Sequence, residues 1–139
     1  MISRVLVPMD ESEMAERALK YALEVHPDAE ITVLHVVGEP SSMMGRAAGI
    51  ALSDDPERAA EEHARELFER AREIAAEAGA EIETVVKSGH PARAVINASG
   101  EFDTVVIGSH SGTLADRLLV GNVAEKIVRR SGAPVTVVR

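Results

Sequence analysis

Short runs of apolar, mostly β-branched residues alternate along this chain with longer amphipathic segments, and this alternation restricts the fold more than any other feature. The apolar runs occupy residues 2–7, 31–37, 82–86, 104–107 and 134–138. Because polar residues rarely interrupt them, they predict strands that are buried on both faces of a sheet. Strands of this kind that are connected by helices form an open parallel sheet with right-handed crossovers. The predicted fold class is therefore α/β, with helices on both faces of five strands.

The four segments between the strands carry the start and stop signals of helices. Ser12 is a good N-cap for the first helix. Pro56 suits the first turn of the longest helix, and Gly79 suits its end. A short helix is expected before the fourth strand, and the last helix is expected to begin at Gly121 and Asn122. The connection over residues 39–55 is long, and the sequence leaves open whether it is a lid or a disordered surface loop.

Length and composition exclude several classes of protein. The 139 residues suffice for one domain, expected over residues 1–139, and the formal charge of −8 with scattered basic residues argues against a nucleic-acid partner. The chain has no cysteine, so it has no disulfide framework, and a cytoplasmic location is the simple expectation. No apolar stretch reaches the ~20 residues of a membrane span, and the first residues do not resemble a signal peptide.

Candidate functional residues follow the first and fourth predicted strands. In open parallel sheets, ligands bind beyond the carboxyl ends of the strands, where the strand order reverses. Asp10 follows the first strand and could accept hydrogen bonds from a ribose diol, or it could simply be a turn residue. Gly108 begins a Gly/Ser-rich loop that ends at Gly121, where a helix N-terminus could bind a phosphate. The alternative is a plain connection with Asn122 as the helix N-cap.

Other chemistry lacks the residues that it needs. The sequence contains no G-x-x-x-x-G-K-[ST] loop, no G-x-G-x-x-G after the first strand and no G-x-S-x-G elbow. The five histidines show no metal-ligand spacing, so no metal site and no catalytic residue is predicted. His35 is expected to be a hydrogen-bonded histidine of the strand, and His63 is expected on the surface of the long helix. Only His110 lies where a phosphate could bind.

Five segments together resemble the universal stress protein (UspA) family. They are VLVPMDESE at residues 5–13, LHVV at 34–37, IGSH at 107–110, LLVGNVAEK at 118–126 and APVTVVR at 133–139. They occur in the family's order and spacing across essentially the whole chain. The resemblance implies a strand order of 3-2-1-4-5. It also implies a homodimer formed through the last strand, Pro134 to Val138, whose apolar edge requires cover.

One branch of this family binds ATP through the motif G-x2-G-x9-G-[ST]. Gly108 matches its first glycine and Gly121 its third, whereas Ser111 replaces the second glycine and Asn122 replaces the final hydroxyl residue. Gly112 could compensate for Ser111 by a small shift of the loop. The Asn122 amide could still donate to a phosphate, and losing one hydroxyl contact costs about 1 kcal/mol rather than the whole affinity.

The resemblance further implies that Asp10 binds the ribose and that Pro8, Val36 and Ile107 surround the adenine. The full set of candidate nucleotide-binding residues is Pro8, Met9, Asp10, Val36, Ile107, Gly108, His110, Ser111, Gly112, Gly121, Asn122 and Val123.

Three hypotheses of function follow. The first is an adenine-nucleotide-binding regulatory module of the stress response, a homodimer that binds ATP with or without Mg²⁺ and acts on a protein partner. The second is a dimeric interaction protein of the same family that binds no nucleotide, which Ser111 and Asn122 favour. The third and least favoured is a slow ATP hydrolase, because no base or nucleophile is positioned in the sequence.

Overall fold

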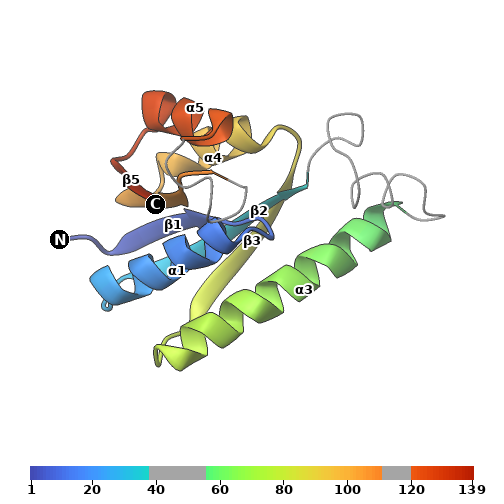
Figure 1. Ribbon diagram of the computed structural model, residues 1–139, viewed down its shortest axis with the longest axis horizontal. Coiled ribbons are helices and arrows are strands. Elements are labelled where there is room, and N and C mark those ends of the chain that lie inside the picture. Colours follow the sequence, from blue (N-terminus) through green and yellow to red (C-terminus); the bar gives the residue numbers. More distant parts are fainter. Residues whose placement is uncertain (38–55, 111–119) are drawn as a thin grey trace.

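The computed structural model describes residues 1–37, 56–110 and 120–139; the predicted 39–55 connection, Ser111 and Gly112 lie outside these residues. The elements alternate in the predicted order (Figure 1). The strands are β1 (Arg4–Pro8), β2 (Glu30–Val37), β3 (Ile82–Ser88), β4 (Thr104–Gly108) and β5 (Val135–Val138). The helices are α1 (Glu13–Val25), α3 (Pro56–Glu77), α4 (Pro91–Ser99) and α5 (Asn122–Arg130).

The strands form one parallel sheet in the order β3-β2-β1-β4-β5, which confirms the predicted topology. Helices α1 and α3 cover one face, and α4 and α5 cover the other (Figure 1). The chain adds β2 and β3 on one side of β1, and then crosses to add β4 and β5 on the other side. The strand order therefore reverses between β1 and β4, at the centre of the sheet.

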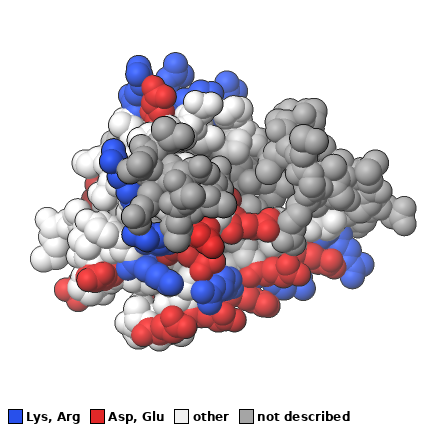
Figure 2. Space-filling view, viewed as in Figure 1, with Lys and Arg blue, Asp and Glu red and all other residues white. Residues whose placement is uncertain are grey.

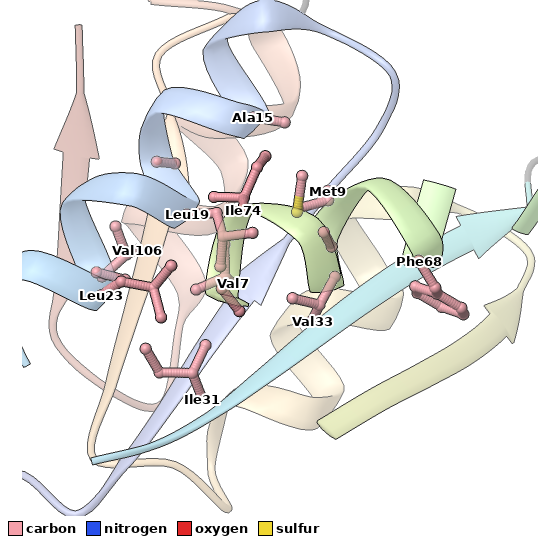
Figure 3. Close-up of a cluster of buried hydrophobic side chains, with 14 of the residues drawn as sticks. Val7, Met9, Ala15, Leu19, Leu23, Ile31, Val33, Phe68, Ile74 and Val106 are labelled. Atoms are coloured by element: carbon pink, nitrogen blue, oxygen red, sulfur yellow. The ribbon is translucent and has the colours of Figure 1, made fainter. Parts of the chain in front are cut away.

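Each face of the sheet has its own hydrophobic core. Alternate side chains of β1 point to opposite faces, so that Val7 packs under α1 and α3 while Leu6 packs under α4 and α5. Leu19 of α1 and Ile74 of α3 meet the sheet in the first core (Figure 3). A fully buried leucine or isoleucine side chain stabilises the fold by roughly 1.5–3 kcal/mol. The two cores fix the sheet on both sides.

The structure confirms the predicted helix starts at α1 and at α5. The hydroxyl of Ser12 accepts the backbone N–H of Ala15 at 3.1 Å, which confirms the predicted cap of α1. At α5 the N-cap is Gly121 and Asn122 is the first helical residue, so the alternative of Asn122 as N-cap is wrong. The reason is a hydrogen bond from Gly121 N–H to Ser109 O, 2.6 Å, which holds residue 121 in an extended conformation.

A carboxylate fastens the amino end of the chain to the amino end of β4. Oδ2 of Asp103 accepts the backbone N–H of Ser3 at 2.9 Å, that of Arg4 at 2.9 Å and the Ser3 hydroxyl at 3.0 Å. These hydrogen bonds, the one from the Ser3 N–H foremost, stabilise the ionised form and lower the pKa of Asp103. They also mark Arg4 as the start of β1, two residues later than the apolar run suggests.

The surface charge is unevenly distributed. Acidic side chains gather around α1 and α3, whereas lysine and arginine crowd α5 (Figure 2). An ion pair between Arg70 and Glu16, 2.9 Å, links α3 to α1. Within residues 1–37, 56–110 and 120–139, no helix has both the length and the apolarity needed to cross a membrane.

Candidate functional site

The residues that follow β1 and β4 meet at the carboxyl edge of the sheet. Met9 N–H donates to Leu34 O of β2 at 2.8 Å, and Ser109 N–H donates to Val138 O of β5 at 2.8 Å. Both strand ends are thereby continued one residue beyond the sheet. Asp10 and His110 come next in the chain on two neighbouring strands, so the point where the strand order reverses lies between them.

Helix α5 begins at this edge. The hydrogen bond from Gly121 N–H to Ser109 O places its first residue beside the end of β4. The first backbone N–H groups of the helix, at Asn122 and Val123, have no acceptor within the helix, and both residues are exposed. These N–H groups and the positive end of the helix dipole suit an anion.

The two glycines that match the nucleotide motif, Gly108 and Gly121, are suited to their positions for different structural reasons. A Cβ on Gly108 would lie 2.9 Å from the backbone carbonyl carbon and oxygen of Met14, so glycine is needed for β4 to pass under α1. A Cβ on Gly121 would lie 3.4 Å from Cα of His110, which is a tight but ordinary contact. Neither residue has a positive φ. Gly108 therefore serves helix packing, and Gly121 keeps the helix start close to His110.

Asp10 combines both interpretations made from the sequence. Its Oδ1 accepts the backbone N–H of Ser12 at 2.8 Å, which makes it a turn residue at the start of α1. The side chain is exposed, and a carboxylate has a second oxygen and further lone pairs. Asp10 can therefore hold the turn and still accept hydrogen bonds from a ligand hydroxyl.

The candidate adenine contacts share one face of the sheet but differ in burial. Pro8, Val36 and Ile107 all lie on the α4 and α5 face, as the alternation along each strand requires. Pro8 and Val36 are half-buried at the carboxyl edge, whereas Ile107 is 3% exposed and belongs to the core. Met9 faces the opposite side and is 5% exposed in the other core. Pro8 and Val36 are thus the apolar groups nearest to the surface.

Ser109 lies beside the candidate site and is absent from the set of residues that the sequence analysis proposes. Its side chain is fully buried beside the start of α5, and its hydroxyl has no hydrogen-bond partner among the residues that the structure describes. A buried hydroxyl without a partner is uncommon. The signal in the sequence was its position directly after Gly108, at the end of a predicted strand.

Two histidines support the loop after β1 from below. His35 is buried, and its Nδ1 lies 2.9 Å from Met9 O, which confirms a hydrogen-bonded histidine. The predicted surface position of His63 is wrong: its side chain is 12% exposed, and Nε2 lies 2.9 Å from Glu11 Oε1. Its ring packs edge to face on His35 at 5.5 Å. The charged neighbours of His63 in sequence project from other sides of α3, which concealed its inward position.

The described part of the chain contains no group of three or more histidine or acidic side chains that could hold a metal ion. The described residues at this edge offer helix amides for an anion, a carboxylate for hydroxyl groups, and an apolar rim.

Comparison with known proteins identifies the family. The model of the universal stress protein family matches residues 1–139. Universal stress protein YxiE of Bacillus subtilis is 29% identical over 148 residues, covering 100% of both chains. The solved structure of MJ0577, a universal stress protein of Methanocaldococcus jannaschii, has a TM-score of 0.80 at 25% identity and covers 99% of this chain and 96% of its own.

A second solved structure was determined with a ligand. It is a universal stress protein in complex with cAMP, with a TM-score of 0.71 at 25% identity, and the match covers 99% of this chain and 97% of that one. The solved structures share the five-stranded α/β fold of this chain, and the family model spans all of it. The chain belongs to the universal stress protein family.

Proposed function

We propose that this chain is a regulatory module that binds an adenine nucleotide, ATP foremost, and works as a homodimer. The observation that carries the proposal is the hydrogen bond from Gly121 N–H to Ser109 O, which brings the start of α5 to the point where the strand order reverses. A relative solved in complex with cAMP supports an adenine nucleotide as the ligand.

The residues present fit the parts of a nucleotide. The phosphates would meet the amides at the start of α5, where Gly121 presents no side chain. The unpartnered hydroxyl of Ser109 lies beside this helix start, but it is fully buried and lies behind the surface that a ligand would contact. Asp10 would accept the ribose hydroxyls through the oxygen that Ser12 does not use. Pro8 and Val36 offer the exposed apolar surface for the base.

Calorimetry of ATP binding, with and without Mg²⁺, tests the nucleotide proposal. We expect measurable binding that Gly121→Val weakens at least tenfold, because valine fills the approach to the helix amides. Gly100→Val is the matched control, since a Cβ there meets nothing within 4 Å and its φ of −64° suits any residue. Asp10→Asn should weaken binding about tenfold by removing a charged acceptor.

Two outcomes would redirect the assignment. No heat at millimolar ATP would leave the dimeric interaction protein as the function, with Asp10 only a turn residue. Phosphate release in the same samples, lost in Asp10→Asn while binding persists, would favour the slow hydrolase.

The dimer proposal rests on the outer edge of β5. Within the described residues, β5 pairs with β4 alone, and its strand is entirely apolar except for Thr136. Val105 N–H donates to Pro134 O and Ser109 N–H to Val138 O. In a parallel ladder, groups alternate between neighbours, so the N–H and C=O of Val135 and Val137 point away from β4. A second copy could pair with this edge.

Proline at the central position tests this edge selectively. Val137→Pro removes an outward N–H and keeps the bonds of Thr136 to β4, so we expect a monomer in light scattering with an unchanged circular dichroism spectrum. Val137→Ala, the control, loses more apolar surface but keeps the N–H and should remain a dimer. Dimeric Val137→Pro would show that this edge is not the interface.

A further inference from the structure

Helix α4 is too short to cover the strands beneath it. Its nine residues, Pro91–Ser99, span about 14 Å, whereas the eight residues of β2 span about 26 Å. The amino-terminal half of β2 and β3 consequently extends beyond α4 on this face, where Ala98, Glu101 and Phe102 border a hollow. The space is a groove of about 340 Å³ that extends along β2 and β3 from Glu30 and Glu83 to Lys87, close to the carboxyl edge of the sheet.

The floor of the groove is apolar except for one hydroxyl. Leu6 and Leu34 are 1% exposed and form the floor with Val85 of the edge strand. Thr32 lies beside them and is 4% exposed. Its hydroxyl makes no hydrogen bond to any residue that the structure describes, although it lines the groove. A hydroxyl that is nearly buried and points into a groove without a partner requires one from outside.

Carboxylates surround this hydroxyl. Glu83 of β3 is the direct partner of Thr32 in the strand register, and Glu30 precedes Thr32 by two residues on the same face. Glu101 follows α4 at the same end. All three are exposed, and none forms an ion pair within the described residues. The groove therefore holds three negative charges beside an apolar floor.

Two cationic side chains, Arg4 and Lys87, also line the groove and partly offset its negative charge. Arg4 lies at the same end, but its guanidinium stacks on Phe102 at 4.8 Å and donates to Glu101 O at 2.8 Å. Lys87 lines the other end, four residues beyond Glu83 on β3 and hence about 13 Å away. One end of the groove is thus anionic and the other is cationic.

We propose that this groove binds an aliphatic monocation, an ammonium or guanidinium group on a short apolar chain. The head would lie between Glu30 and Glu83 and donate to the hydroxyl of Thr32, and the chain would cover Leu6 and Leu34. Lys87 disfavours a second positive charge at the far end, so a diamine is a poorer ligand than a monoamine. The group could belong to a free amine or to a lysine or arginine side chain of a partner.

Methyl NMR of the full chain provides the test. Butylamine and butylguanidine should shift the methyl signals of Leu6, Leu34 and Val85, with 1,4-diaminobutane weaker and butanol weaker still. N-acetyl-lysine amide and N-acetyl-arginine amide, titrated in parallel, distinguish a presented side chain from a free amine. Glu83→Gln should weaken butylamine binding about fivefold, as expected for one exposed charge pair. Glu24→Gln, the same change on the opposite face, should leave it unaltered.

Thr32→Val separates binding from folding. Valine has the shape of threonine without the unpaired hydroxyl, so the unliganded variant should unfold at the same or a higher temperature while butylamine binds at least threefold more weakly. Equal shifts by butanol and butylamine, or full binding in Glu83→Gln, would overturn the proposal. None of the residues that line the groove belongs to the candidate nucleotide-binding set, so the result of this test does not depend on whether the chain binds a nucleotide.

Discussion

Replacing Gly108 by alanine tests how closely β4 and α1 are packed. The new Cβ would lie 2.9 Å from the carbonyl carbon and oxygen of Met14, closer than such atoms approach in folded proteins. Both neighbours belong to the backbone, so relief requires a shift of α1 rather than of a side chain. Overpacking of this kind costs about 1–3 kcal/mol. For 139 residues this corresponds to a fall in melting temperature of roughly 3–10 °C.

Thermal unfolding followed by circular dichroism measures this fall, at one protein concentration because dimerisation would shift the midpoint. Gly121→Ala is the matched comparison: its Cβ contact is 3.4 Å and its φ of −70° suits alanine. Alanine is a poorer N-cap than glycine, which lowers stability, but it also reduces the entropy of the unfolded chain, which raises stability. These two effects nearly cancel, so the melting temperature of Gly121→Ala should stay within a few degrees of that of the wild type. If Gly108→Ala has the same melting temperature as the wild type, the close approach to Met14 does not restrict residue 108, and the packing explanation is wrong.

Further substitutions test other contacts. Ser12→Ala removes the cap of α1 and should cost about 0.5–2 kcal/mol in guanidinium unfolding. Ile74→Ala, at a position 2% exposed, should cost about 2–5 kcal/mol in the same assay. Asp103→Asn should be destabilising at pH 7. Because the pKa of Asp103 is lowered in the folded state, its contribution is present above the ordinary value near ~4 and is lost as the pH falls through the folded pKa, so the two proteins should converge in acid.

Most of the fold could be predicted because its signals are local. Continuous apolar runs identified all five strands, and Ser12 and Gly79 marked helix ends that the structure confirms at α1 and α3. The strand order came from the family resemblance, since apolar runs alone do not say which strands are neighbours. The hydrogen-bonded pairs of strands in the structure show the same order.

The site was harder to predict because its details depend on contacts between distant segments. Glycine is required at position 108 because the backbone of Met14, 94 positions away in the sequence, lies so close. The nucleotide motif assigns this glycine to a phosphate and carries no information about that contact. His63 looked like a surface residue until α3 was placed against β2 and its ring met His35. The pairing of Thr32 with Glu83 likewise needs the strand register, which a sequence without alternating polarity does not fix.

The hydrogen bonds between Asp103 and Ser3 also bear on the order in which the strands can pair during synthesis. Of the five described strands, β1 is synthesised first and lies at the centre of the sheet, yet its partner β4 and the carboxylate that secures it lie 100 residues later. Strands β1, β2 and β3 with α1 and α3 can assemble earlier, because their contacts with one another fall within the first 88 residues. Until α4 follows, the Leu6 and Leu34 face of that half-sheet stays open to water. We expect this interval to be when the nascent chain most needs protection from aggregation.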